Sequence, residues 1–216
     1  HIQLLDARLA DLLRRREAIT TIVPCEGAAP LVFVELPPEP ARMIIFGAME
    51  FSTALAAAAA VLGYRVTVCD PRPLFATADR FAGAEVVVQW PTEFLAERIA
   101  AGEVDERTVL CVLSHDSRFD AELIDIALRS RAAYVGAMGS RTTHDRRLAS
   151  LAERGVEPAV IERLHSPIGL DLGASTPEET AISILAEVLA ARTAASSRPL
   201  SLTDGAIHPA ALRAIR

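Results

Sequence analysis

The sequence has little cysteine, few aromatic residues and no excess of positive charge. Its 216 residues include three cysteines, Cys25, Cys69 and Cys111, and no two of them have a CxxC spacing. This pattern argues against a structural zinc site or a redox dithiol, so we expect no bound metal and a reduced, cytoplasmic compartment. One Trp, two Tyr and a formal net charge of −6 argue against a nucleic-acid partner, which needs positive charge and stacking rings.

Long hydrophobic runs are absent as well. The longest apolar stretch, residues 51–63, contains Ser52 and Thr53 and is too short to cross a bilayer, so no membrane span is expected. The first 16 residues carry their charges last, unlike a signal peptide. Hydrophobic residues nevertheless make up 51% of the chain, which is enough for a real core. The sequence begins with His1 rather than Met, which leaves open that it is a piece of something longer.

The cysteines differ in their surroundings. Cys69 and Cys111 lie inside apolar runs, which favours packed and unreactive thiols. Cys25 lies in a turn-like stretch beside Glu26 and Gly27, so it is the cysteine that we expect to be exposed.

A cluster of prolines divides the sequence. Residues 37–40 read PPEP, a stiff connector and the clearest boundary in the chain. We therefore predict an N-terminal segment (1–40), a Rossmann-like domain (41–192) and a C-terminal tail (193–216). Within the N-terminal segment the patterns predict an amphipathic helix over 2–16 and strands over 18–23 and 31–36.

Beyond the boundary, short apolar runs alternate regularly with helical patterns. The predicted strands are 43–46, 65–69, 85–88, 108–113 and 133–135. The predicted helices are 51–62, 91–101, 120–129, 142–153 and 177–192, the last with Thr176 as N-cap and Glu179 at capping-box distance. Strands that are apolar on both faces indicate a sheet covered by helices on both sides. The predicted fold class is therefore α/β, a doubly wound, mostly parallel sheet of Rossmann type.

The turn after the first strand of this domain departs from the dinucleotide fingerprint. Gly47 and the small Ser52 suit the first and sixth positions, but Met49 stands where the pyrophosphate should meet bare backbone, and Glu50 adds a negative charge. Asp70 ends the second strand, where a ribose-binding acid belongs. The turn therefore indicates a nucleotide-type pocket in which NAD(P) binding is weakened. The alternative is a doubly wound sheet with an ordinary tight turn.

The fourth strand ends in Ser114-His115-Asp116, which opens into the same crevice as Gly47 if the strand order reverses there. Adjacent residues cannot form a catalytic relay. His115 can still serve as a proton carrier or ligand donor, and we assign His115 and Asp116 the catalytic role, with Ser114 as a cofactor contact. The alternative is that Asp116 caps the next helix.

The fifth strand leads into the stretch best suited to phosphate. Gly136 and Gly139, followed by Ser140 and Arg141 at a helix start, predict an anion cradle with one fixed positive charge. The alternative is that Gly139 permits a turn and Ser140 caps the helix. The loop over residues 166–177 is long enough to be functional as well.

Five stretches of the sequence resemble the C-terminal Rossmann-like half of the XdhC family of xanthine dehydrogenase accessory proteins, with its CoxI and CoxF relatives. They occur in family order and cover residues 43–192. Their sequences are IIFGAMEF, LGYRVTVCDPRPLFATADRF, VLSHDSRFD, YVGAMGSRTTHDRRL and HSPIGLDLGASTPEETAISILAE. Such a series is far more specific than a single glycine motif.

The resemblance implies a helper of molybdenum hydroxylases rather than the dehydrogenase itself. Such proteins bind the molybdenum cofactor (molybdopterin), attend its sulfuration by a cysteine desulfurase and deliver it to a xanthine or carbon monoxide dehydrogenase-like enzyme. Family members show glycine then histidine where this chain has Met49 and Glu50. Most of their N-terminal cofactor domain has no counterpart in this sequence, which offers only residues 1–36 for it. There Cys25-Glu26-Gly27 resembles a cysteine–glycine motif, with Glu26 in place of a glycine.

Two other functions stay open from the residues alone. An NAD(P)-dependent oxidoreductase would use the same crevice, and Met49 and Glu50 argue against it. A Rossmann domain kept for protein–protein contact, a homodimer included, would not need the anion-friendly stretch from Gly136 to Arg141.

Overall fold

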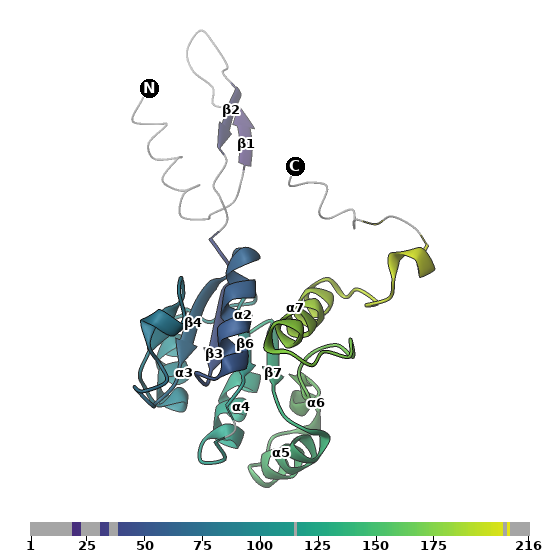
Figure 1. Ribbon diagram of the computed structural model, residues 1–216. Coiled ribbons are helices and arrows are strands. Elements are labelled where there is room, and N and C mark those ends of the chain that lie inside the picture. Colours follow the sequence, from purple (N-terminus) through teal and green to yellow (C-terminus); the bar gives the residue numbers. More distant parts are fainter. Residues whose placement is uncertain (1–18, 23–30, 35–38, 115, 205–206, 208–216) are drawn as a thin grey trace. The chain divides into compact units, whose positions relative to one another are not determined.

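The computed structural model describes residues 39–114, 116–204 and 207, and the backbone of two strands before them. The chain divides into two compact units, residues 1–40 and 41–216. In the first unit the two predicted strands are present as β1 (Ile19–Ile22) and β2 (Leu31–Val34), and they pair antiparallel (Figure 1). The helix predicted over residues 2–16 and Cys25 lie outside the described residues.

The second unit is built on a six-stranded, all-parallel sheet with the order β5-β4-β3-β6-β7-β8. Its strands are β3 (Arg42–Phe46), β4 (Arg65–Cys69), β5 (Glu85–Val87), β6 (Val109–Val112), β7 (Tyr134–Ala137) and β8 (Leu164–His165). The chain moves outward from β3 in one direction and then from β6 in the other. This is the doubly wound order of a Rossmann fold, so the predicted fold class is confirmed.

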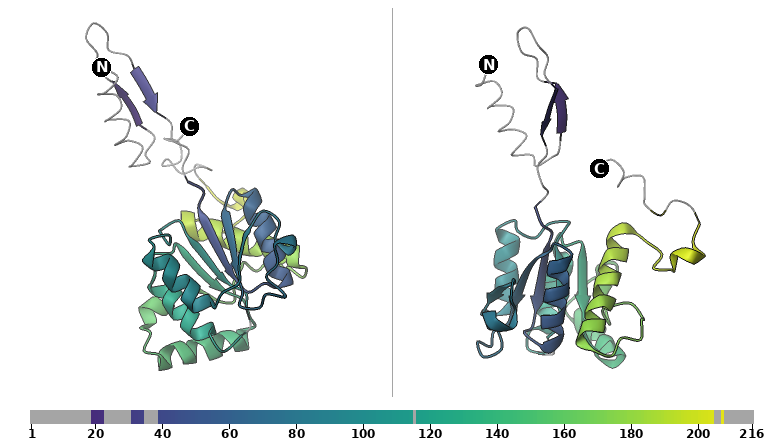
Figure 2. Two further views of the ribbon diagram at one scale, coloured as in Figure 1. Left: turned by 90° about the vertical axis from the view of Figure 1, so that its left-hand side faces the viewer. Right: turned by 45° about the horizontal axis from the view of Figure 1, so that its top comes forward.

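Helices cover both faces of this sheet (Figure 2). They are α2 (Glu50–Val61), α3 (Pro91–Ala100), α4 (Asp120–Arg129), α5 (Arg141–Glu153), α6 (Pro158–Ile161) and α7 (Pro177–Thr193), with short 3₁₀ turns η1 (Ala78–Arg80) and η2 (Leu200–Leu202). The described part of the chain has no helix long and apolar enough to span a membrane.

Each face of the sheet buries its own half of the core. Because side chains alternate along a strand, Met43 and Ile45 of β3 join the cluster under α2 and α7. Ile44 and Phe46 join the cluster under α3, α4 and α5. This two-sided burial explains why the strands are continuous apolar runs in the sequence.

The last helix begins as its sequence predicts. The Thr176 side chain accepts a hydrogen bond from the Glu179 backbone at 3.1 Å, and the Glu179 carboxylate accepts one from the Thr176 backbone at 3.1 Å. These bonds form a capping box, which satisfies two backbone donors that the first turn of a helix otherwise leaves free.

The structure departs from the predicted elements around the fifth strand of the domain. The predicted strand at 133–135 is instead β7 (Tyr134–Ala137), so Gly136 lies inside a strand rather than in the loop after it. β8 and α6 are not among the predicted elements, because elements of two and four residues are too short to show hydrophobic periodicity.

Candidate functional site

The carboxyl ends of the six parallel strands lie at one edge of the sheet, and the strand order reverses between β3 and β6. Open α/β sheets hold ligands at such a switch point. Gly47, which follows β3, has φ +104°, and a Cβ added to it would lie 2.8 Å from the backbone nitrogen of Ser114. Glycine is therefore required here, because the turns after β3 and β6 are in direct contact. A cavity of about 320 Å³ lies beside them, lined by Met49, Arg72, Ser114, Asp116 and Ser117.

Asp70 lies at the end of β4, as predicted, but its carboxylate is fully engaged. One oxygen accepts from the backbone nitrogen of Ala48 at 2.7 Å and from Arg72 Nη2 at 2.7 Å. The other accepts from the backbone nitrogen and Nε of Arg72, both at 2.9 Å. Burial raises the pKa of Asp70, but the bonds from Arg72 and Ala48 outweigh it and hold the pKa below its usual value. A ribose hydroxyl would have to displace Arg72 to reach this acid.

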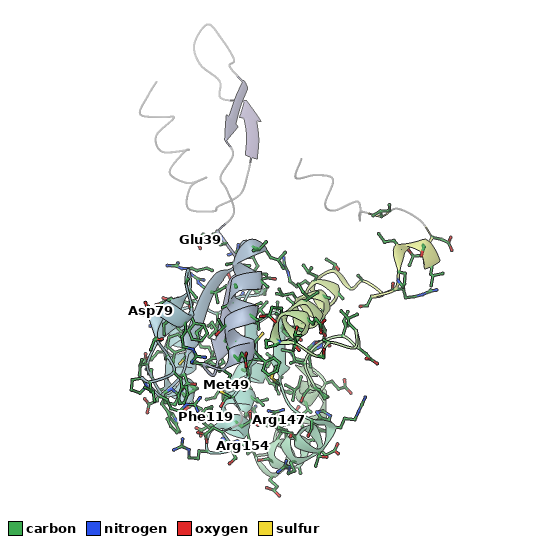
Figure 3. The ribbon with its side chains drawn as sticks, viewed as in Figure 1. Glu39, Met49, Asp79, Phe119, Arg147 and Arg154 are labelled. Atoms are coloured by element: carbon green, nitrogen blue, oxygen red, sulfur yellow. The ribbon has the colours of Figure 1, made fainter. Side chains whose placement is uncertain are left out.

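The turn after β3 is closed by contacts within the chain. The backbone nitrogen of Ala48 is bound by Asp70, and that of Met49 donates to the Ser52 hydroxyl at 3.4 Å. The Met49 sulfur lies 3.7 Å from Arg72 Nη2. A pyrophosphate approaching this turn would meet a thioether and a buried carboxylate in place of free N–H groups. Met49 lies at the carboxyl edge of the sheet, where it lines the cavity beside Ser114 (Figure 3).

The loop after β6 carries a second ion pair. Ser114 is buried, and its hydroxyl accepts from the backbone nitrogen of Asp116 at 3.1 Å. The guanidinium of Arg118 donates to both carboxylate oxygens of Asp116 and lowers the pKa of that acid to about 2. Asp116 is therefore a carboxylate at neutral pH and suits hydrogen-bond acceptance rather than proton donation. His115 lies outside the described residues.

The predicted anion cradle is shorter than its sequence indicates. A Cβ on Gly136 would lie 2.5 Å from the Ile168 side chain, so this glycine makes room for the loop after β8. The rest of the cradle is the half-buried Gly139 and the exposed Ser140 and Arg141. Ser140 is the N-cap of α5 and accepts from the Thr143 backbone at 3.2 Å, which agrees with the alternative interpretation of this stretch. Arg141 is exposed and has no ion-pair partner among the described residues.

Sequence reasoning missed a buried arginine, Arg147, which joins three segments of this edge (Figure 3). Its Nε lies 2.7 Å from Asp120 of α4, its Nη2 donates to the Met138 carbonyl at 2.8 Å, and its Nη1 donates to the Ser166 hydroxyl at 3.3 Å. The sequence does carry a signal for its burial. Arg147 precedes Leu151 by four residues, and this spacing places both on the buried face of α5.

Glu187 of α7 was missed as well, and it holds the loop after β8. It accepts a hydrogen bond from the Tyr134 hydroxyl at 2.5 Å and one from the Gly169 backbone at 2.7 Å, and it lies 3.2 Å from His165 Nδ1. Burial raises the pKa of Tyr134, so the phenol stays protonated and donates. The backbone of Ile168 donates to the Ala137 carbonyl at 3.1 Å, which places this loop at the same edge.

The two described cysteines supply no thiolate to this edge. Cys69 and Cys111 are buried in β4 and β6, and burial raises the pKa of each thiol to about 12. The predicted packed state of both is confirmed, and a thiol with that pKa is inert at neutral pH. In the described parts of the chain, no three His, Cys, Asp or Glu side chains are grouped so as to hold a metal ion.

A family model described as the XdhC Rossmann domain matches residues 43–188, more than half of the chain. The chain belongs to the XdhC family. Among curated relatives, a protein of Bacillus subtilis (strain 168) named as a probable xanthine dehydrogenase subunit is 30% identical over 188 residues, which are 87% of this chain and 53% of that protein. The "Molybdenum cofactor insertion chaperone PaoD" of Escherichia coli (strain K12) is 27% identical over 70% of this chain and 40% of that protein.

A solved structure shares this fold as well. The crystal structure of a protein described as a xanthine dehydrogenase from Bacillus halodurans superposes with a TM-score of 0.62 at 28% identity, covering 78% of this chain and 46% of that one. The chain thus spans about half, or less, of each of these relatives. What the family model describes in this chain is the Rossmann unit.

Proposed function

We propose that this chain is an accessory factor of XdhC type, which binds the molybdenum cofactor and assists its sulfuration by a cysteine desulfurase. The chain then helps to insert the cofactor into a molybdenum hydroxylase related to xanthine dehydrogenase or carbon monoxide dehydrogenase. Membership of the XdhC family supports this function, and so does the name of the relative PaoD, a molybdenum cofactor insertion chaperone.

One geometric observation supports the proposal. The dinucleotide turn is closed, because the Ala48 N–H is bound by Asp70, whereas the start of α5 is open and carries the exposed Arg141, which has no ion-pair partner among the described residues. The carboxyl edge therefore suits a phosphate-bearing ligand that is not a dinucleotide in the usual pose.

The described residues fit the organic, phosphate-bearing part of such a cofactor. Gly139, Ser140 and Arg141 would hold a phosphate at the start of α5, and the loop held by Glu187 borders the same edge. When bound, the cofactor supplies the molybdenum chemistry of the client hydroxylase. The part of this chain that the structure describes binds and orients it and offers no thiolate at this edge.

The test is to purify the chain from cells that make the cofactor and to measure the fluorescence of the oxidised pterin that it releases. Arg141→Ala should reduce the released pterin strongly, because the open end of the cradle loses its positive charge. Met49→Gly should change it little. Arg131→Ala is the matched control, since Arg131 pairs with Glu106 away from this edge. If Met49→Gly alone creates or abolishes binding, the assignment is wrong.

A second function, a Rossmann domain used for protein contact, is favoured by one feature of the surface. A groove of about 630 Å³ lies between α2 and α7 and is lined largely by Ala and by Val61 and Ile182, which are 87% and 58% exposed. Exposed apolar surface of this kind marks contact with other proteins. Val61→Arg should then change the oligomeric state in light scattering or lower client activation. An unchanged result in both assays removes this candidate.

A further inference from the structure

A second cavity at the carboxyl edge lies between α4 and α5 and has a volume of about 440 Å³. Its α5 wall is formed by Thr143, Arg146, Arg147 and Ser150, which share one face of the helix because their spacing is i, i+3, i+4 and i+7. A helix face that looks toward a neighbouring helix is normally apolar. Here the four residues that line the cavity are all polar, which indicates a role other than packing.

The charges that line this cavity do not cancel. Arg147 is neutralised by Asp120, with N–O distances of 2.7 and 3.2 Å. Arg146 is exposed, and within the described residues its guanidinium makes a single hydrogen bond, a long one of 3.4 Å to the Thr142 carbonyl. It has no acidic partner among the described residues, so the lining carries one positive charge in excess.

Hydroxyl groups face the same space. The side chains of Ser117 and Ser150 line the cavity, and neither has a hydrogen-bond partner within the described residues. A guanidinium together with hydroxyl donors is the usual protein environment of a phosphate group. The volume falls within the range of small-molecule pockets and exceeds the need of a single inorganic oxyanion.

We propose that the cavity between α4 and α5 binds the phosphate group of a small organic phosphomonoester, with Arg146 as its counter-charge and Ser117 and Ser150 as hydrogen-bond donors. Ser117 also lines the cavity at the switch point, so a ligand anchored here extends toward Met49 and Arg72. The subsite goes beyond the proposed function, in which the phosphate of the cofactor is held by Gly139, Ser140 and Arg141. It is separate from the start of α5 at Arg141, which does not line this cavity.

The experiment titrates the full chain with phenyl phosphate in a calorimeter. Arg146→Gln should weaken binding about tenfold or more, because a charge-assisted contact is lost. Ser150→Ala should weaken it by a smaller factor. Arg154→Gln is the matched control at the C-cap of α5, since Arg154 pairs only loosely, at 3.8 Å, with Asp125 and lies outside the cavity. Equal affinity of the Arg146 and Arg154 variants would overturn the proposal.

Two further measurements complete the experiment. The first distinguishes an organic phosphate from inorganic phosphate, and the second distinguishes failure of the subsite from failure of the proposed function. Inorganic phosphate should bind at least tenfold more weakly than phenyl phosphate, and equal affinity would refute an organic ligand. Loss of phenyl phosphate binding in Arg146→Gln, with no pterin released from the unaltered chain, would support the subsite and reject the molybdenum cofactor. Pterin release that is normal in Arg146→Gln, with phenyl phosphate binding unchanged as well, would reject the subsite and leave the proposed function standing.

Discussion

Asp70 joins the turns after β3 and β4, because it pairs with Arg72 of its own turn and accepts the Ala48 N–H of the other. The Asp70 side chain is 2% exposed, whereas that of Arg72 is 43% exposed, so the pair is only partly removed from water. The Asp70 carboxylate also receives the Ala48 N–H. A buried carboxylate that accepts four hydrogen bonds in this way stabilises the fold mainly by giving the neighbouring N–H donors an acceptor.

We therefore predict that Asp70→Asn lowers the free energy of unfolding by ~2 kcal/mol at pH 7, a value discounted for the exposure of Arg72. The pKa of Asp70 is lowered in the folded state, so its contribution is complete above the ordinary pKa of an aspartate and is lost as the pH falls through the lowered one. The difference between the two proteins should be constant from about pH 5 to 8 and shrink below about pH 4. Urea unfolding at several pH values measures it.

Asp171→Asn is the control for this prediction, because Asp171 is exposed and its side chain has no hydrogen bond among the described residues. A loss of stability that persists unchanged at low pH would show that the Asp70 carboxylate is not its source.

Met49 is the residue at which this turn departs from a dinucleotide fingerprint, and its removal should not restore NAD(P) binding. Met49→Gly takes away the thioether, but the Ala48 N–H stays bound to Asp70 at 2.7 Å. We expect weak or undetectable binding of NAD(H) and NADP(H) to both the unaltered chain and the variant in calorimetry. Micromolar affinity for NADP in either protein would contradict this expectation.

At the scale of the elements, Arg147 links α5 to α4, to the end of β7 and to the loop after β8, so it holds four segments together. It is 3% exposed, and its removal would leave Asp120 and the Met138 carbonyl without their main donor. We predict that Arg147→Ala lowers the free energy of unfolding by about 3–5 kcal/mol, the usual cost of an unpaired buried charge. Arg154 is the half-exposed C-cap residue of α5, and Arg154→Ala should cost less than about 0.5 kcal/mol in the same urea titration. Equal losses would mean that Arg147 does not link these elements.

Elements with a strong hydrophobic periodicity could be predicted from the sequence, but the contacts between them could not. The helix at 120–129 and the capping box at Thr176 are where the patterns place them, because period and capping chemistry are local. Gly136 was expected in a loop, because its reason for being glycine is Ile168, which lies far along the chain in the loop after β8. Asp70 was located correctly at the end of its strand, but its pairing with Arg72 and Ala48 depends on tertiary geometry.

Five of the loops at the carboxyl edge carry the contacts described above, those after β3, β4, β6, β7 and β8. The first two are joined by Asp70, and the last two are bridged by Arg147, which bonds to Met138 and Ser166. The loop after β6 lies between them and lines both cavities through Ser117. A ligand at either cavity therefore contacts this loop, which carries the predicted residues His115 and Asp116.

We predict that His115→Ala leaves the melting temperature unchanged and reduces cofactor binding or the activation of a client molybdenum hydroxylase. The reason is its position directly after Ser114, whose backbone is in contact with the Gly47 turn at the switch point. A neutral imidazole there can donate or accept one proton near neutral pH. Melting temperature and client activation should be measured on the same preparation, with Asp116→Asn as a companion variant. A solvent-facing histidine without a role predicts no change in either quantity, and unchanged activation would remove His115 from the site.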